Sequence, residues 1–411
     1  MSALKFWIWL ASCRRVGART AGMLLEHFGS PEAVFFAEEE EFKKIEGLGK
    51  AEIDSLIHKN LIGARKILAE CENRGFRVIT INDAEYPARL KNISNPPIIL
   101  YVGGRLPAVD EEAAVAVAGT RDCTPYGIKT AERIGYEIAK AGGLVVSGLA
   151  RGIDSAATRG ALRAGGRVVG VIGSGLDVVY PPQNRALFND VMSTGAIISE
   201  YPPGTEAYRS NFPARNRILS GISVGVVIIE APRHSGALIT AARALEQGRD
   251  VFSVPGNVDA AACEGSNRLL LEGAIPAVSG FDIMEEYMSL YPEKLGRAGS
   301  IKTVPLDPLM TKKLINRELA GENAPLNPTK KEIDNTESMA YIDLVIRSGE
   351  LSETESAVIS TVKTGEMYVD DIIAGSLLPA PEVLSALTML EIKGHILRRA
   401  GNRIVLNTTG K

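Results

Sequence analysis

The run Ala113-Ala-Val-Ala-Val-Ala-Gly119 is an apolar segment of strand length, and the small and polar residues Thr120 and Arg121 follow it. Similar runs recur at near-regular spacing, with helix-like stretches between them. Continuous apolar runs are typical of parallel strands that are buried on both faces, and the intervening helices form the crossovers. The sequence therefore predicts a doubly wound, Rossmann-like α/β domain. Its expected strands are residues 113–119, 144–148, 167–173, 196–199, 224–231, 250–254 and 274–278.

Shorter segments flank this domain. Residues 76–103 have the pattern of a short αβ extension with proline-marked turns. The segment after Met288 is rich in Pro, Lys, Glu and Asn and lacks periodicity, which is typical of a flexible linker. We expect a helical domain at residues 1–70, an extended Rossmann-like domain at 71–290, a linker at 291–349 and a winged-helix domain at 350–411.

The helical domain contains two similar pieces, residues 16–25 and 45–56, which resemble helix-hairpin-helix units of a SAM-like domain. In the second piece Gly47 and Gly49 would form the hairpin, and backbone N–H groups of the next helix could hold a phosphate. Only this piece has a lysine, Lys50, at that point. The same glycines would also suit a domain that contacts protein, and both alternatives stay open.

The last segment predicts three helices, at residues 355–363, 369–375 and 381–393, and a hairpin at 395–405 that turns at Gly401-Asn402. A winged helix that reads duplex DNA needs basic and amide side chains on its third helix and wing. Between residues 350 and 401 there are eight acidic and only four basic residues. We therefore expect this domain to contact protein or to modulate the main pocket.

The composition excludes several classes of protein. The 46 Lys and Arg against 49 Asp and Glu give a net charge of −3, so a site for a polyanion must be local. Four scattered cysteines suggest neither a zinc site nor a disulfide framework, which fits a reducing cytoplasm. The apolar run Phe6–Leu10 is too short for a signal peptide, and no stretch is long enough to span a membrane. We expect a cytoplasmic protein without a metal.

The predicted strands end in loops of small and polar residues, such as Gly119-Thr120-Arg121 and Gly173-Ser174-Gly175. In an open parallel sheet, ligands bind outside the carboxyl ends of the strands, where helix N-termini converge. Glycines let the backbone approach an anion, and arginines could close over it with bidentate contacts. The sequence therefore predicts a phosphate pocket at this edge.

The sequence contains no recognisable set of catalytic residues. The four histidines are dispersed, and only His234, beside Ser235, falls in the α/β domain. No GxxxxGK[ST] loop is present, and no cluster of paired carboxylates marks a metal site. We therefore do not expect hydrolysis of nucleotides by a Walker-type mechanism.

Seven motifs in the α/β domain together resemble one protein family. In order and spacing they resemble the DNA-processing protein A family (DprA, also called Smf), and they cover essentially the whole domain. They are Val117-Ala-Gly-Thr-Arg121 with Thr124-Pro-Tyr-Gly127, Val146-Ser-Gly-Leu-Ala-Arg-Gly-Ile-Asp154, Gly173-Ser-Gly-Leu-Asp177 with Tyr180-Pro-Pro-Gln-Asn184, Ser199-Glu-Tyr-Pro-Pro-Gly204, Phe212-Pro-Ala-Arg-Asn-Arg217, Ser235-Gly-Ala-Leu-Ile-Thr240 and Val254-Pro-Gly256.

The resemblance implies a cytoplasmic bacterial protein that binds and protects single-stranded DNA, works as a homodimer, and loads a RecA-type recombinase in natural transformation. It implies no cofactor and no catalysis. Thr120 stands where the family usually has serine and keeps the hydroxyl. By motif, the DNA-binding residues would be Gly119, Thr120, Arg121, Ser147, Gly148, Arg151, Gly173, Ser174, Gly175, Asn184, Arg185, Arg215, Asn216 and Arg217.

Two groups of apolar residues add to this hypothesis. Bases of a single strand stack on aromatic rings, and Tyr126, Tyr180 and Phe212 are candidates, although Phe212 would also suit the core. Family resemblance and a leucine cluster together place the dimer interface late in the α/β domain, at Leu245, Leu269 and Leu270.

A second family on the same architecture gives the alternative hypothesis. The chain is also similar to cytokinin-activating phosphoribohydrolases, which process nucleotides with a PGGxGT motif and a nearby catalytic glutamate. The corresponding loop here is Ser235–Thr240, and no carboxylate follows it at that spacing. Release of base from nucleoside monophosphates would distinguish the enzyme from the DNA-binding protein.

Overall fold

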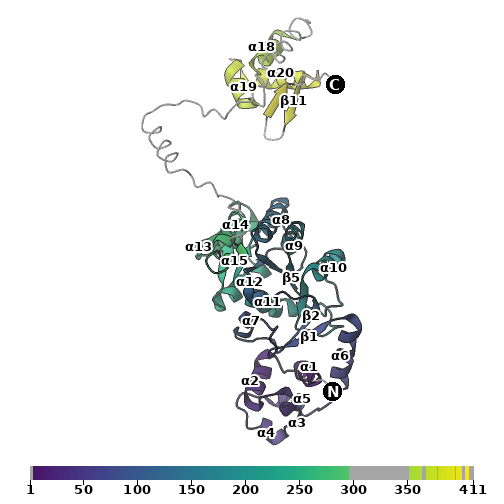
Figure 1. Cartoon of the computed structure of the whole chain (residues 1–411). Helices are drawn as coiled ribbons and strands as arrows, with labels where there is room; N and C mark the ends of the chain where they lie inside the picture. Colours follow the sequence, from purple (N-terminus) through teal and green to yellow (C-terminus); the bar gives the residue numbers. More distant parts are fainter. Residues whose placement is uncertain are drawn as a thin grey trace. The chain divides into compact units, whose positions relative to one another are not determined.

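The computed structural model describes residues 3–295, 351–362, 367–376, 378–393, 395–399 and 403–406. Contacts divide the chain into two compact units, residues 1–303 and 304–411. Within the described part, no helix is long and apolar enough to cross a membrane. The first unit contains the helical domain, the extension and the α/β domain, and the second contains the winged helix (Figure 1).

The helical domain is built from six helices, and a tight hairpin precedes the fifth. Gly47 has a φ of +85°, a left-handed conformation that favours glycine, and Gly49 is the N-cap of the next helix. Phe6, Trp9 and Phe35 pack their rings together in the core of this domain. The helices are α1 (Leu4–Ser12), α2 (Ala18–Phe28), α3 (Pro31–Phe36), α4 (Glu39–Phe42), α5 (Lys50–Leu56) and α6 (Ile62–Arg74).

A nine-stranded sheet forms the centre of the first unit, in the order β1-β2-β6-β5-β4-β3-β7-β8-β9. All seven strands predicted for the α/β domain are present and run parallel, so the predicted fold class is confirmed. They are β3 (Ala114–Ala118), β4 (Leu144–Ser147), β5 (Val168–Val171), β6 (Ala196–Ser199), β7 (Gly225–Ile228), β8 (Asp250–Ser253) and β9 (Ile275–Pro276).

The extension completes the sheet at one edge. Strands β1 (Arg77–Thr80) and β2 (Ile99–Gly104) pair antiparallel, and a short helix, α7 (Ala88–Lys91), lies between them. Strand β2 also pairs antiparallel with β6, where Tyr101 is opposite Ser199. The extension therefore makes the predicted parallel sheet a mixed one.

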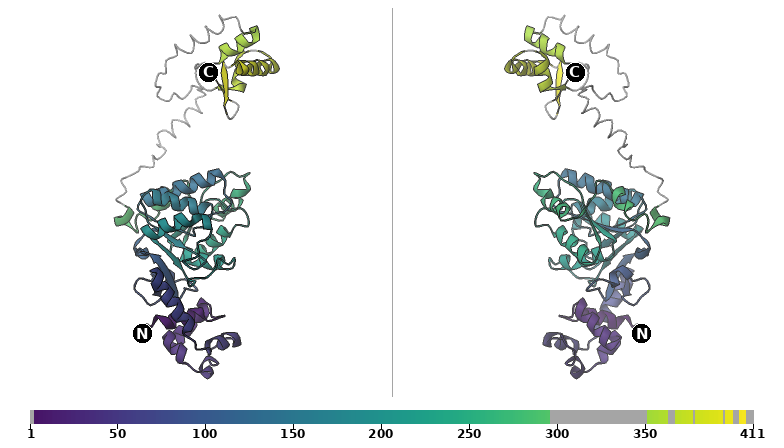
Figure 2. Two further views of the ribbon diagram at one scale, coloured as in Figure 1. Left: turned by 90° about the vertical axis from the view of Figure 1, so that its right-hand side faces the viewer. Right: turned by 90° about the vertical axis from the view of Figure 1, so that its left-hand side faces the viewer.

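Helices cover both faces of the sheet (Figures 1 and 2). Alternate residues of β3 point to opposite faces, so Val115 and Val117 join one core and Ala114 and Ala116 the other. The first core includes residues of α8 (Pro125–Lys140), α9 (Ile153–Arg163), α10 (Arg185–Thr194) and α14 (Gly280–Glu285), and the second includes residues of α7, α11 (Asn211–Gly221) and α12 (Gly236–Glu246). Helix α13 (Glu264–Leu271) leads to β9, and 3₁₀ turns occur at Val109–Glu111, Pro182–Asn184 and Ala261–Cys263.

The first residues of the expected linker belong to the folded unit. Helix α15 (Pro292–Leu295) buries Leu295, and Lys294 forms an ion pair of 3.0 Å with Glu112. The rest of the expected linker, residues 296–349, lies outside the described residues.

The second unit has the order of elements expected for a winged helix. Helices α18, α19 and α20 enclose a small core that includes Val358, Ile372 and Leu387. The expected turn at Gly401-Asn402 lies outside the described residues. The elements are α18 (Glu353–Thr361), β10 (Met367–Tyr368), α19 (Val369–Ser376), α20 (Ala380–Ile392), β11 (Ile396–Arg399) and β12 (Arg403–Leu406).

Candidate nucleic-acid interface

A pocket of about 630 Å³ opens at the carboxyl ends of the parallel strands. Its walls come from the loop after β3, the start of α9, the first turns of α11 and the loop that leads into α12. This is the edge at which doubly wound sheets hold ligands. Five of the predicted site residues line the pocket: Gly119, Thr120, Arg121, Arg215 and Asn216.

Arg121 gives the pocket an exposed cation on an aromatic support. Its guanidinium carbon lies 4.8 Å from the ring centre of Phe212, and that ring lies 5.5 Å from Tyr180. The Tyr180 side chain is 42% exposed. A cation, a half-buried ring and an exposed ring thus follow one another beside the pocket, an arrangement that suits an anion with a flat, stackable group.

Arg215 is the buried cation of the pocket, with only 4% of its surface exposed. Burial lowers its pKa to about 10, while the negative charge of Asp154 acts in the opposite direction. Burial likewise raises the pKa of Asp154, which the charge of Arg215 opposes. The Nε of Arg215 has no hydrogen-bond partner. Arg215 therefore brings a buried, unsatisfied N–H donor to the wall of the pocket.

Gly148 is required by this buried pair. A Cβ at this position would collide with Nη1 of Arg215 and would lie 2.6 Å from Oδ2 of Asp154. Ser147, just before it, is fully buried, and its hydroxyl donates to the carbonyl of Asp154 at 3.2 Å. These two predicted residues therefore shape the wall behind the pocket.

Several other predicted residues have partners within the protein. The amide of Asn184 donates to the Leu149 carbonyl at 2.9 Å and to Ser155 at 2.8 Å, and the Ser174 hydroxyl donates to the Val178 carbonyl at 2.9 Å. Both side chains are buried. These hydrogen bonds hold the two loops in place.

The segment Thr205–Asn211 covers the predicted Gly173–Gly175 loop. The side-chain amide of Asn211 donates a hydrogen bond to the Gly173 carbonyl at 2.9 Å. The backbone N–H of Gly175 donates to the Thr205 carbonyl at 2.8 Å. All three residues of this loop are buried, and the bond from Asn211 ties the loop to the first turn of α11.

The remaining predicted arginines differ in their surroundings. Arg217 forms a two-pronged ion pair with Glu200, at 2.6 and 3.2 Å, and both side chains are largely buried. Arg151 pairs with Asp122, but both are well exposed. Arg185 is exposed at the first position of α10. Of these three, Arg151 and Arg185 have exposed side chains.

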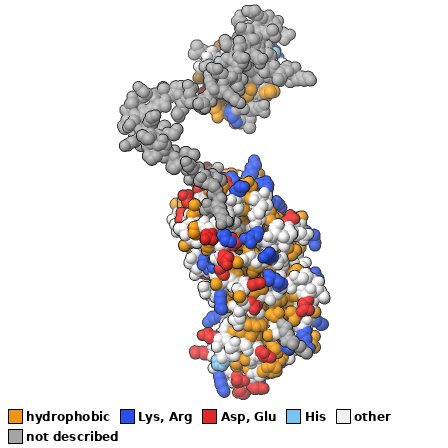
Figure 3. All heavy atoms as spheres, viewed as in Figure 1, with side chains coloured by type: hydrophobic (Ala, Val, Ile, Leu, Met, Phe, Trp, Pro, Cys, Tyr) orange, Lys and Arg blue, Asp and Glu red, His pale blue; other side chains and the backbone are white. Residues whose placement is uncertain are grey.

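The second hairpin of the helical domain is less suited to phosphate than its sequence predicts. Lys50 is exposed, but a Cβ on Gly49 would lie only 2.6 Å from a carboxylate oxygen of Glu52. A carboxylate at the first turn of a helix occupies the position that an anion would take. Figure 3 also shows acidic side chains gathered over the neighbouring α4, which carries Glu39, Glu40 and Glu41.

The predicted DNA-binding residues do not include one wall of the pocket, nor the residue that holds the loop before α8 in place. The wall includes Pro232, His234, Thr240 and, from α13, Glu264. The residue that holds the loop is Glu230, which is buried two residues after β7 and accepts hydrogen bonds from the backbone N–H and hydroxyl of Thr124 at 2.9 and 2.6 Å. A charged residue at the end of an apolar strand was the available signal.

Comparisons with known proteins identify the family to which the chain is similar. A family model described as DNA recombination-mediator protein A matches residues 77–288, and one described as the DprA winged helix domain matches residues 347–402. The chain is 33% identical to "Protein Smf" of Synechocystis over 404 residues, 97% of each protein, and 38% identical to "DNA processing protein DprA" of Bacillus subtilis, over 54% of this chain and 74% of that one. The X-ray structure of DNA processing protein A from Streptococcus pneumoniae aligns with a TM-score of 0.61 and 32% identity, covering 70% of this chain and 99% of that chain.

Proposed function

This chain belongs to the DNA recombination-mediator protein A family, and from that premise we propose that it binds single-stranded DNA in the pocket beside Arg121. The observation that carries the proposal is that the side chains of Arg121, Phe212 and Tyr180 lie in contact, one after another, beside the pocket. A single strand offers both phosphates and unpaired base faces, whereas a duplex hides the faces in its stack. Aromatic rings and cations together are therefore selective for single strands and tolerant of sequence.

The site works through local charge. The residues from Ala113 to Met288 include 14 arginines and two lysines against 17 acidic residues, so the domain as a whole does not attract DNA. Arginine forks bind phosphate with two parallel hydrogen bonds, and the buried donor of Arg215 adds a fixed contact. We propose that one phosphate lies between Arg121 and Arg215 and that a neighbouring base stacks toward Tyr180.

We further propose that the protein is a homodimer. Leu245 is 63% exposed and Leu271 is 81% exposed, while Leu269 is half-buried against the core. Apolar side chains this exposed on α12 and α13 support an interface on these helices. Leu270→Arg is expected to give a folded monomer in sedimentation at high micromolar concentration. A monomeric unmodified protein at that concentration would exclude the dimer, and unfolding of the variant would assign this leucine to the core.

The wider role rests on family resemblance. We propose that the protein acts in the bacterial cytoplasm, protects incoming single strands, and loads a RecA-type recombinase on them during natural transformation. Strand-exchange assays with a recombinase and a single-strand-binding protein test the loading step. No increase in recombinase filaments on coated strands would contradict it.

We also propose that the pocket does not catalyse a reaction. Each acidic residue of its lining lies near an arginine: Asp154 near Arg215, Asp122 beside Arg151, and Glu264 3.8 Å from Arg233. The positive charge of each arginine opposes proton uptake by its carboxylate. Incubation with nucleoside monophosphates is expected to release no free base, and release would favour the phosphoribohydrolase alternative.

A mobility-shift series with single-stranded and duplex oligonucleotides tests the central proposal. Single-strand affinity is expected to fall with salt along a log-log slope near −0.7 for each phosphate contact. Duplex is expected to bind far more weakly at every salt concentration. Equal affinity for both forms would contradict a site that depends on exposed base faces.

A further inference from the structure

Helix α11 supplies three residues at the pocket, Phe212, Arg215 and Asn216, from its first turns, and it ends at Gly221. The last carbonyls of a helix lack partners within the helix and carry partial negative charge. Two arginines meet these carbonyls. Nη2 of Arg249 donates to the Gly221 carbonyl at 3.3 Å, and Nη1 of Arg89 donates to the Ile222 carbonyl at 3.4 Å.

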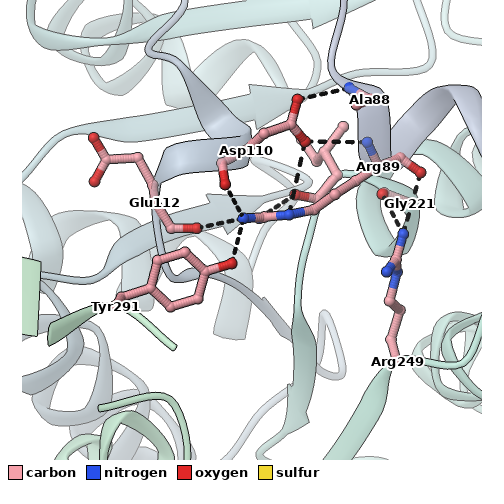
Figure 4. Close-up of polar contacts among 8 residues, drawn as sticks. Ala88, Arg89, Asp110, Glu112, Gly221, Arg249 and Tyr291 are labelled. Atoms are coloured by element: carbon pink, nitrogen blue, oxygen red, sulfur yellow. Dashed lines mark hydrogen bonds and ion pairs between the residues drawn. The ribbon is translucent and has the colours of Figure 1, made fainter. Parts of the chain in front are cut away.

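Arg89 is itself held by several elements (Figure 4). Its Nη2 donates to the carbonyls of Asp110 and Glu112, both at 2.8 Å, and to the hydroxyl of Tyr291 at 2.6 Å. Its side chain is only 12% exposed. One guanidinium therefore joins the extension, the segment before β3, the end of α11 and the chain that follows α14.

Asp110 also holds the first turn of α7, the helix that carries Arg89. The carboxylate of Asp110 accepts hydrogen bonds from the backbone N–H groups of Ala88 and Arg89, at 2.6 and 3.0 Å. Arg249 also donates to the Arg89 carbonyl at 3.1 Å, as Figure 4 shows. The position of the Arg89 side chain is thus set by its own backbone as well as by its acceptors.

Close packing leaves α11 little room to shift. A Cβ on Gly221 would lie 2.9 Å from Leu90 and 3.0 Å from Ile93, so the backbone of α11 rests directly on the α7 segment. A helix of 11 residues is a stiff rod of about 16 Å, and a displacement at its end is transmitted to its start. The end of α11 therefore controls where its first turns lie.

From these contacts we propose that Arg89 is a positioning residue for the DNA pocket: it fixes the end of α11 and thereby the placement of Phe212 and Arg215. The inference rests on the proposed single-strand binding at that pocket. It assigns a role in DNA binding to a residue of the extension that does not line the pocket.

The test compares Arg89→Gln with Arg167→Gln in the full chain. Arg167→Gln is a matched control because it removes one positive charge from the same group of contacts. Arg167 donates to the Glu112 carboxylate at 2.6 Å, and no hydrogen bond or ion pair joins it to α11 among the described residues. Binding of a short oligothymidine is measured across a salt series. Hydrogen exchange of the amides at residues 211–217 is followed with and without the oligonucleotide. Arg89→Lys, which keeps the charge, is measured beside them and decides the question if Arg89→Gln does not fold.

We expect Arg89→Gln to raise Kd about fivefold, with an unchanged salt slope and faster exchange at residues 211–217, while Arg167→Gln stays within twofold of the unmodified protein. Arg89→Lys is expected to shift both measurements in the same direction, by less. A slope reduced by about 0.7 would mean that Arg89 contacts phosphate directly and would overturn the proposal. Affinity and exchange equal to the Arg167 control would also overturn it. If the unmodified protein binds no single strand, the proposed function fails, and the exchange data alone decide whether Arg89 positions α11.

Discussion

The α/β domain and the winged-helix domain both have architectures that can bind nucleic acid, yet they arrange their charges in opposite ways. In the α/β domain, Arg121 is exposed on an aromatic ring and Arg215 is buried with an unpartnered donor, although acids outnumber bases in the domain. In the winged helix, Lys393 forms an ion pair of 2.8 Å with Glu355, and Glu382 is exposed on α20. The two domains thus differ less in their number of charges than in which of these charges face an open pocket.

The largest effect is expected for Arg121→Ala, which removes the exposed cation of the pocket. Single-strand affinity should fall at least tenfold, because a charge-assisted contact contributes about 1.5–3 kcal/mol, and the salt slope should fall by about 0.7. Fluorescence anisotropy with a labelled oligonucleotide measures both. Arg163→Ala, at the far end of α9 and 64% exposed, is the control and should change affinity less than twofold.

A smaller effect is expected for Arg185→Ala. Arg185 is exposed at the start of α10 but does not line the pocket, so it reaches only the strand outside it. Affinity should fall about threefold, or roughly 0.65 kcal/mol, in the same assay. If both Arg121→Ala and Arg185→Ala stay folded and keep full affinity, the assignment of the pocket is wrong.

Deleting residues from Glu350 onward tests the other side of the comparison. Repulsion between the acidic tail and phosphate implies that the tail adds little to binding, so single-strand affinity should stay within about threefold. A titration of the shortened chain beside the full chain measures the difference. Binding of duplex by the isolated tail with sequence preference would break the comparison and would indicate a transcription regulator.

The smallest effect concerns acid sensitivity of the winged helix. The hydrogen bond from Lys393, and a second from the Ser352 backbone, lower the pKa of Glu355 from its ordinary value of 4.5. This contribution to stability is complete above pH 4.5 and is lost as pH falls through the lowered pKa. The protection of amides in α18 and α20, expressed relative to their intrinsic exchange rate at each pH, should therefore fall below pH 4.5. In Lys393→Met this loss of protection should be smaller, and an equal loss would show that the pair is not responsible.

Much of the α/β domain could be predicted because its strands are buried on both faces and leave continuous apolar runs. Strand β9 is the shortest, at Ile275–Pro276, where the proline lacks the N–H that a longer ladder needs. The pairing of β2 with β6 could not be predicted, since the two strands are distant in sequence and no local pattern records their register. Local chemistry predicts the elements, and long-range packing decides their neighbours.

The same limit applies to the pocket. Glycine-rich loops after strands predicted where it lies, and Gly119, Thr120 and Arg121 are in its lining. The burial of Asn184 and the ion pair of Arg217 with Glu200 depend on segments that meet only in the folded protein. A polar residue in a motif can therefore serve to shape the site through contacts within the protein as well as to contact a ligand.

The antiparallel place of β2 beside β6 also has a consequence for synthesis. As the chain leaves the ribosome, the antiparallel strands β1 and β2 emerge first, but the second neighbour of β2 is complete only when Ser199 has followed. Until then β2 has an unpaired apolar edge, which is the kind of surface that chaperones bind and that aggregates in crowded cells. Three βα units must be made in that interval, so slow translation across β3, β4 and β5 prolongs the exposure of this edge.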